Sequence, residues 1–315
     1  EISACLVGSE MCIRDRNRIH AVRYTPDDGN VRGIVQIVHG MAEYVERYEN
    51  LAEFLTKRGI LVTGEDHLGH GKSVSEGGSF GYFCEQDPAT VVVRDVHRLK
   101  KITEEQYPQV PYIILGHSMG SFIARNYLCR YGSGIGGAVI VGTGMQPAGL
   151  IFASKAMAGI QKLFCGSKHV SHFIDKAAFG GYNKRIDSPR TSSDWLSRNT
   201  ENVDRYIEDE LCGFTFTVNG FQTLFELIRR LQKQENLEKV PQNLPILMVS
   251  GAEDPVGDYG KGVHKACDSL KRAGVKNITV KLYENDRHEL LNEDDAEVAM
   301  EDIWQWICKE IPGIA

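Results

Sequence analysis

A serine in this chain stands in a context typical of a catalytic nucleophile. Ser118 is the centre of Gly116-His117-Ser118-Met119-Gly120, which follows an expected strand and precedes an expected helix. This is the strand–turn–helix setting that a G-x-S-x-G motif requires, in which a sharp turn exposes the serine hydroxyl. The glycines keep neighbouring chain clear of the turn, and the amides at the helix N-terminus favour developing negative charge. The pentapeptide therefore predicts a nucleophilic serine.

A serine hydroxyl needs a base, and the base needs a carboxylate that orients it. Asp254 and His288 each follow an apolar stretch expected to be a strand, and they give the chain order Ser, acid, His. Asp258 and Asp286 are rival acids. Asp258 stands further along its loop. Asp286 is only two residues from the histidine, which is too close in sequence for its carboxylate to hold the imidazole from the side opposite the serine. We therefore expect Asp254 to orient His288.

The negative charge that develops on an attacked carbonyl oxygen needs two backbone N–H donors. One should belong to Met119, the residue after the nucleophile. The other should follow an earlier strand, where His39-Gly40-Met41-Ala42-Glu43 stands. Gly40 permits the turn there, so Met41 is the expected second donor.

The elements that must position these loops alternate along the chain. Apolar strands are expected at 20–24, 33–38, 60–63, 112–115, 138–141, 244–249 and 278–282. Helices are expected at 48–58, 88–107, 119–130, 260–273 and 294–309. Buried strands that alternate with helices indicate a parallel sheet covered on both faces. The fold class is therefore α/β, with the candidate residues at the ends of strands.

The interval 145–240 lacks this alternation and is rich in phenylalanine. We expect a helical cap here, with helices near 151–164, 193–209 and 220–234, inserted in a core formed by 17–144 and 241–315. The aromatic side chains fit either a substrate site or the cap's own core. The candidates for contact with substrate are Phe152, Met157, Phe214 and Phe216.

Composition excludes several classes of protein. The 315 residues include 36 Lys+Arg and 42 Asp+Glu, which gives a formal net charge of −6, and 42% are hydrophobic. This chain is too apolar for disorder, and it is too acidic to bind nucleic acid by neutralising phosphates. The eight cysteines show no CxxC spacing, which is typical of free thiols in a reducing compartment, so we expect a cytoplasmic protein.

Cofactor and metal motifs are missing from the sequence. Gly69-His70-Gly71-Lys72-Ser73 would need a glycine at position 66 to be a phosphate-binding loop, and Asp66 stands there. His169 and His172 have no third ligand at a suitable spacing. We therefore expect no cofactor, no metal and no obligate protein partner.

The first residues do not read as a native start or as a signal peptide. The string from Glu10 to Arg16 resembles a translation of the transposon end sequence used to prepare DNA libraries. We expect residues 1–16 to be a non-native scar.

The motifs together resemble the monoacylglycerol lipase and lysophospholipase branch of the α/β-hydrolases, a family also described as serine aminopeptidase-like. The resemblance runs from about residue 20 to 311, and the CGFTFTVNG stretch (212–220) looks like the cap of bacterial members. It is carried by HGMAEYVERY (39–48), DHLGHGKS (66–73), GHSMGS (116–121), SGAEDPVG (250–257) and NDRHELLNE (285–293).

This resemblance implies an α/β-hydrolase fold in which Ser118 is the nucleophile, Asp254 the acid and His288 the base. Met41 and Met119 would supply the oxyanion amides. The implied reaction is hydrolysis of a small lipid ester, a monoacylglycerol or a lysophospholipid, with no cofactor. A cap of this kind is also compatible with peripheral membrane contact.

Two other functions stay open. An aminopeptidase or amidase would need an acidic cluster in the cap to hold a substrate ammonium, for which Glu208, Asp209 and Glu210 are candidates. The loss of one of the three catalytic residues would favour a non-catalytic binding protein of the same fold. Here the serine, the aspartate and the histidine are all present.

Overall fold

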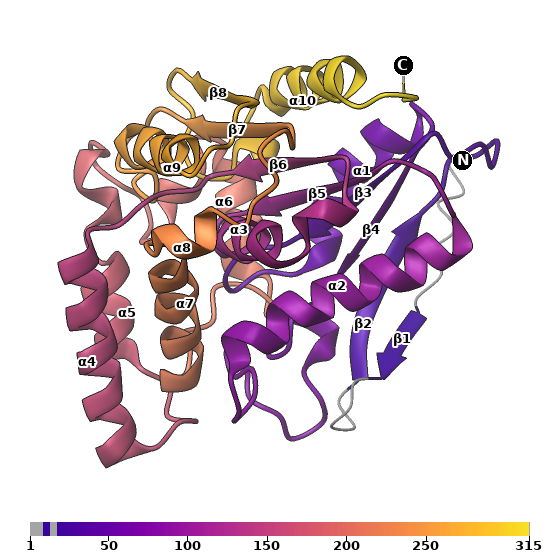
Figure 1. The fold of residues 1–315 in the computed structure, drawn as a ribbon. Coiled ribbons are helices and arrows are strands. Elements are labelled where there is room, and N and C mark those ends of the chain that lie inside the picture. Colours follow the sequence, from indigo (N-terminus) through magenta and orange to yellow (C-terminus); the bar gives the residue numbers. More distant parts are fainter. Residues whose placement is uncertain (1–8, 13–17, 315) are drawn as a thin grey trace.

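A single twisted sheet organises the chain in the computed structural model, which describes residues 9–12 and 18–314 (Figure 1). It has eight strands in the order β1-β2-β4-β3-β5-β6-β7-β8. The ladder is parallel from β4 to β8, whereas β2 is antiparallel to β4 and β1 to β2. The strands are β1 (Ser9–Cys12), β2 (Arg18–Tyr24), β3 (Gly33–Val38), β4 (Ile60–Glu65), β5 (Tyr112–His117), β6 (Gly137–Val141), β7 (Ile246–Gly251) and β8 (Ile278–Tyr283).

Helices cover both faces of this sheet, as the buried apolar strands predict. In β3, Ile34 and Val38 pack against the side that holds α2 (Pro88–Gln106), α3 (Met119–Tyr131) and α9 (Lys261–Arg272). Val35 and Ile37 point the other way, toward α1 (Glu49–Thr56) and α10 (Ala296–Glu310). The predicted α/β class is confirmed, and the strand positions agree with expectation to within a few residues.

The segment between β6 and β7 is helical. Its helices are α4 (Ala148–Cys165), α5 (His172–Phe179), α6 (Thr200–Glu208), α7 (Val218–Leu231) and α8 (Gln234–Leu237). One isolated bridge, Val170 to Thr217, is its only β pairing among the described residues. We keep the name cap for residues 145–240, and its exact boundaries remain our proposal. In Figure 1 the long helix α4 lies at the outer edge of the molecule, away from the sheet.

One expected cap helix is wrong. The structure replaces a continuous helix at 193–209 with a short 3-10 turn, η5 (Asp194–Leu196), an extended break and then α6. The break occurs because the Asn199 side chain accepts the N–H of Asn202 and caps α6 there. The helix expected near 220–234 is confirmed as α7, and a separate short helix, α8, follows it.

The expectation for residues 1–16 falls largely outside the described residues. Ser9–Cys12 is described, and it forms the edge strand β1 beside β2, which the sequence reasoning did not anticipate. Whether residues 1–16 are native stays a prediction. Within the described chain, no helix has the length and apolarity needed to cross a membrane.

The parallel part of the sheet decides where the candidate residues meet. The loops that follow β3, β5, β7 and β8 carry, in turn, Met41, Ser118, Asp254 and His288. Carboxyl ends of parallel strands lie at one edge, which is where open α/β sheets place their sites.

Candidate active site

The backbone at Ser118 is strained in the way its motif predicts. Its φ is 54° and its ψ is −120°, a conformation that residues other than glycine seldom adopt. The turn is held because the Ser118 N–H donates to the carbonyl of Val141 (3.0 Å) and α3 starts at the next residue. Strain of this kind persists only where surrounding structure enforces it, and it gathers at functional sites.

The two glycines of the motif are steric requirements. A Cβ on Gly120 would lie 1.9 Å from the carbonyl oxygen of Val38, and a Cβ on Gly116 would lie 2.4 Å from that of Gly120. Both obstacles are backbone atoms, which cannot swing aside. Small residues therefore let the first turn of α3 press against the end of β3, and this contact fixes the nucleophile beside the oxyanion loop.

Asp254 and His288 are joined as expected. The Asp254 Oδ2 atom lies 3.0 Å from His288 Nδ1, and both side chains are buried. The carboxylate also accepts the Val256 N–H (2.8 Å) and the Ser250 hydroxyl (3.2 Å). A carboxylate on Nδ1 selects the imidazole tautomer whose Nε2 is free to accept a proton.

Neither rival acid contacts the His288 ring in the described chain. Asp258 is exposed, and Asp286 pairs with Arg198.

The Ser118 hydroxyl makes no hydrogen bond to His288 in the described chain. Hydrogen bonds between a catalytic serine and its base often form or shorten only when substrate binds.

The expected oxyanion donors are available. Among the described residues, the backbone N–H groups of Met41 and Met119 have no hydrogen-bond acceptor. The loop that carries Met41 approaches the serine closely, because a Cβ on Gly40 would lie 3.1 Å from the Cβ of Ser118. Two unpaired amides on either side of a serine form a site that could hold an oxyanion.

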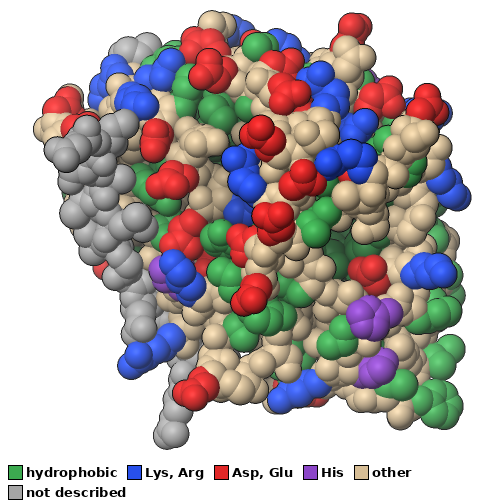
Figure 2. All heavy atoms as spheres, turned by 180° about the vertical axis from the view of Figure 1, so that it is seen from behind, with side chains coloured by type: hydrophobic (Ala, Val, Ile, Leu, Met, Phe, Trp, Pro, Cys, Tyr) green, Lys and Arg blue, Asp and Glu red, His purple; other side chains and the backbone are tan. Residues whose placement is uncertain are grey.

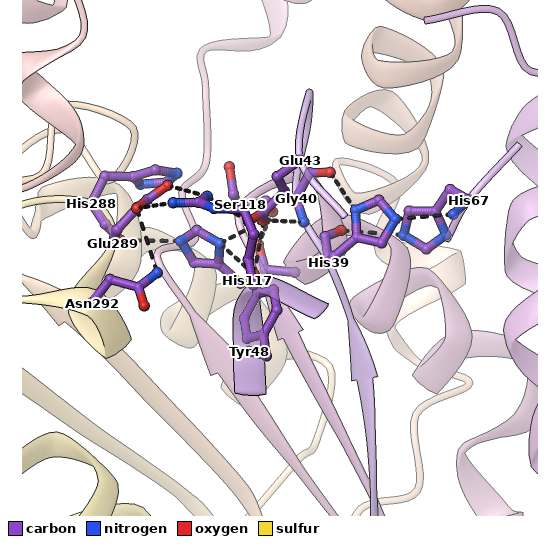
Figure 3. Close-up of polar contacts among 12 residues, drawn as sticks. His39, Gly40, Glu43, Tyr48, His67, His117, Ser118, His288, Glu289 and Asn292 are labelled. Atoms are coloured by element: carbon purple, nitrogen blue, oxygen red, sulfur yellow. Dashed lines mark hydrogen bonds and ion pairs between the residues drawn. The ribbon is translucent and has the colours of Figure 1, made fainter. Parts of the chain in front are cut away.

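A buried glutamate links the oxyanion loop to the histidine loop (Figure 3). Glu43 Oε1 accepts the Gly40 N–H (2.5 Å) and the Tyr48 hydroxyl (2.8 Å), and it lies 3.2 Å from His117 Nδ1. On its other side, His117 Nε2 donates to the backbone carbonyl of His288 (3.1 Å). Glu43 and His117 therefore connect the turn before Met41 to the backbone of His288.

The charges of this pair follow from their surroundings. Burial raises the pKa of Glu43, but the hydrogen bond and charge of His117, with Arg47 nearby, outweigh it and hold that pKa well below its usual range. Burial lowers the pKa of His117, yet the hydrogen bond and charge of Glu43 raise it above its ordinary value. The two groups form a buried ion pair.

Arg47 extends this network into the cap. Its guanidinium reaches Glu43 (3.0 Å) and holds Glu289 with two bonds of 2.7 and 2.8 Å. Glu289 also accepts the side-chain amide of Asn202 on α6 (2.6 Å). Sequence reasoning missed these residues, although Glu43 and Arg47 stand four apart within a motif that it singled out, and Glu289 follows the predicted base.

Three buried histidines support the oxyanion loop from behind. His39 Nδ1 donates to the Gly40 carbonyl (2.9 Å), and His39 Nε2 accepts the backbone N–H of His67 (2.9 Å). Burial lowers the pKa of His39 and of His67, and it lowers that of His70 to about 3. Neutral imidazoles thus serve here as hydrogen-bonding core.

The predicted substrate contacts in the cap lie in different environments. Phe216 is fully buried against His70, and Phe214 is half-buried beside the same ring. Met157 is also half-buried, whereas Phe152 is 77% exposed on α4. Their role in binding substrate remains a prediction.

One side-chain cluster has the composition of a metal site. Ligand atoms of His20, Glu46 and Asp66 lie within 4.8 Å of one another. The Lys72 ammonium, 2.6 Å from Glu46, already brings a cation to this place, and both oxygens of Asp66 accept backbone N–H groups. The carboxylates of this cluster are therefore already paired with the protein's own groups, whereas the buried Nε2 of His20 has no hydrogen-bond partner among the described residues.

A half-buried serine at a strained strand–helix turn, with a buried aspartate–histidine pair at the same sheet edge, defines a serine hydrolase of the α/β-hydrolase fold. Comparison with known proteins agrees. The model of the family described as "Serine aminopeptidase, S33" matches residues 29–295, so the chain belongs to that family.

Curated relatives and solved structures extend this likeness. Monoglyceride lipase of Rattus norvegicus is 29% identical over 273 residues, which cover 86% of this chain and 80% of the relative. Monoacylglycerol lipase of Mycolicibacterium smegmatis is 27% identical over 289 residues, covering 91% and 92% of the two chains. A carboxyl esterase from Bacillus coagulans, solved in complex with glycerol, has a TM-score of 0.90 and 29% identity and covers 98% of this chain and 99% of its own.

The buried ion pair predicts a pH-dependent stability. The contribution of Glu43, whose pKa is lowered, is complete above its unfolded value near pH 4.5, whereas that of His117, whose pKa is raised, is complete below about pH 6.5 and is lost as the pH rises through its folded value. Glu43→Gln should therefore cost the most, about 3–5 kcal/mol, near pH 5.5, and clearly less near pH 9.

Urea unfolding at the two pH values measures this difference. Glu301→Gln, which removes a partly exposed partner of Arg58, is the matched control and should cost less than about 1 kcal/mol at both. An equal cost of Glu43→Gln at both pH values would contradict the ion pair.

Proposed function

We propose that this protein is a serine ester hydrolase that cleaves monoacylglycerols through an acyl-serine intermediate. The observation that carries the proposal is the buried Asp254–His288 pair at the sheet edge that also carries Ser118 on its strained turn. The family match supports it, and so do the relatives whose names are monoglyceride and monoacylglycerol lipase. Lysophospholipids, which share the single acyl ester, are the second substrate class.

The reaction proceeds in two transfers of the acyl group. His288 Nε2 takes the hydroxyl proton as Ser118 Oγ attacks the ester carbonyl, and the amides of Met41 and Met119 hold the oxyanion. Collapse breaks the bond to the alcohol, which leaves with the proton from His288. Water, deprotonated by the same imidazole, then attacks the acyl-serine and releases the fatty acid. Asp254 stabilises the imidazolium in both halves.

Asp254→Asn tests the role of the acid. The exchange keeps the shape but favours the wrong imidazole tautomer, so kcat should fall by about 10⁴-fold. The matched control is Asp258→Asn in the same loop, which is exposed and should leave kcat unchanged. Circular dichroism checks that both variants are folded. If both then hydrolyse a p-nitrophenyl ester at the wild-type rate, Asp254 is not the acid of the triad.

Substrate class is tested by a panel of glycerol monoesters of increasing acyl length beside amino-acid anilides, each run with Ser118→Ala as the inactive reference. We expect kcat/KM to rise with acyl length, since each buried CH₂ contributes about 0.8 kcal/mol. Faster cleavage of the anilides would overturn the lipase proposal in favour of an aminopeptidase.

The structure offers the aminopeptidase alternative little support. Glu208 and Glu210 are exposed, and Asp209 already accepts the hydroxyl of Tyr44 (2.8 Å). These three acids therefore do not form a free anionic pocket for a substrate ammonium.

The cap has a surface suited to a lipid interface (Figure 2, where α4 lies at the right edge). No Asp or Glu occurs between Ala148 and Ile174, whereas Lys155, Lys162 and Lys168 do. Amphipathic surfaces that combine apolar and cationic side chains bind anionic bilayers. The exposed large apolar side chains of this surface are Leu150, Phe152, Ile160, Leu163, Phe164, Val170 and Phe173.

Peripheral membrane contact is tested by sedimentation with phosphatidylglycerol vesicles. The wild-type protein should bind, and Leu163→Asp with Phe164→Asp should lower the bound fraction at least about tenfold, because two large apolar contacts are lost. The control is Val298→Asp, which changes an exposed apolar residue on α10. Equal binding by all three proteins would exclude this surface.

The cysteines indicate the cellular compartment in which the protein resides. Cys129, Cys165, Cys212, Cys267 and Cys308 are free thiols, which fits a reducing compartment, and we infer that the protein is cytoplasmic. Disulfides between these cysteines in protein isolated from its natural host would contradict that placement.

A further inference from the structure

A short piece of the cap is fastened to the loop that carries the catalytic histidine. We call residues Asp194–Arg198 the cap strap. The Glu289 N–H donates to the carbonyl of Leu196 (2.6 Å), and Arg287 Nη1 donates to the carbonyls of Asp194 (2.7 Å) and Ser197 (3.1 Å). These bonds join the strap to the residues on either side of His288.

A buried carboxylate ties the same two segments together again. Glu293 Oε2 accepts the Ser197 hydroxyl (2.8 Å) and the Arg198 N–H (2.9 Å), while its Oε1 accepts the Arg287 N–H (2.8 Å). The Arg198 guanidinium pairs in turn with Asp286 on the histidine loop. The strap and the loop therefore form one hydrogen-bonded unit, although they are about ninety residues apart in the chain.

This unit places an indole against the imidazole. The ring of Trp195 lies 5.1 Å from the ring of His288 between centroids, with the planes tilted by 40°. Trp195 is itself held: its backbone N–H donates to Asn183 Oδ1 (2.9 Å), and the ring of Tyr182 meets the indole edge-on at 4.9 Å between centroids. Aromatic rings in such arrangements attract one another beyond the area they bury.

The remaining sides of the imidazole belong to the core. Asp254 holds Nδ1, and the ring of His117 lies 4.7 Å away. Gly142 closes another side, since a Cβ on it would lie 3.2 Å from Nδ1 and Cε1. Among ring contacts in the described chain, Trp195 is the one that the cap makes with His288. Trp195 therefore covers the imidazole on the side of the cap.

We propose that Trp195 is a positioning residue for catalysis: the cap strap, fastened to the histidine loop, holds the indole against His288 and so keeps Nε2 directed at the nucleophile. The proposal rests on the proposed function, because it assigns His288 the role of base. It also gives the cap a part in the chemical step, beyond its part in choosing the substrate.

The kinetic test uses Trp195→Ala, Trp195→Leu and Trp195→Phe with p-nitrophenyl butyrate, a short soluble ester. Misplacing a catalytic group by about 1 Å can cost about 10²-fold, so Ala should lower kcat by about that factor while KM changes less than about threefold. Phe, which keeps an aromatic wall, should restore kcat to within about fivefold of wild type. Trp304→Ala, a half-buried tryptophan on α10, is the control and should keep wild-type kcat.

Two results would overturn the proposal: wild-type kcat in folded Trp195→Ala, or a rise in KM alone, which would make the indole a substrate contact. If the Ala variant does not fold, Trp195→Leu decides, and we expect it to lose at least about tenfold in kcat. Inactive wild-type protein would instead overturn the proposed function.

A spectroscopic test is independent of activity. His288→Ala should change the tryptophan emission of otherwise wild-type protein, because it removes the ring beside Trp195. The same exchange in a Trp195→Phe background should leave the emission of the remaining tryptophans unchanged. Equal emission changes in both backgrounds, or none in either, would contradict the contact.

Discussion

The close approach of α3 to the end of β3 is the contact on which the site depends. Only a residue without a Cβ at position 120 lets the first helical turn lie against the carbonyls of Val38 and His39. That approach forces Ser118 into its left-handed conformation and brings it beside the loop that carries Met41. Backbone packing thus places Ser118 and the expected oxyanion loop side by side, and the side chains of Glu43 and His39 hold that loop through Gly40.

His288, the proposed base, is positioned in a different way. Because His288 lies on a loop after the edge strand β8, the sheet alone gives it little support. Polar contacts supply that support: Asp254 on Nδ1, His117 on its carbonyl, and Arg47 through the neighbouring Glu289. Such buried networks stabilise only when all members are paired, and here each of these charges has its counterpart. The core and the cap therefore meet at the histidine loop.

The sequence was sufficient for the parts of the structure that follow from local rules. Alternating apolar runs placed the strands, and the glycines around Ser118 predicted the turn, because each signal lies within a few residues. The Glu43–His117 pair and the cap strap depend on residues that meet only after folding. Ser197 and Glu293, for example, are 96 positions apart. The expected helix at 193–209 failed for the same reason, since the Asn199 cap and the bonds to Glu293 interrupt it.

The central claim is that Ser118 is an activated nucleophile, and covalent labelling tests it most directly. The folded protein is treated with a fluorophosphonate, digested and mapped by mass spectrometry, with heat-unfolded protein and His288→Ala in parallel. The structure predicts one adduct, on Ser118, that forms rapidly in folded wild-type protein and slowly or not at all in the two references. Labelling that is absent from folded wild-type protein, or that falls on another serine, would contradict the account.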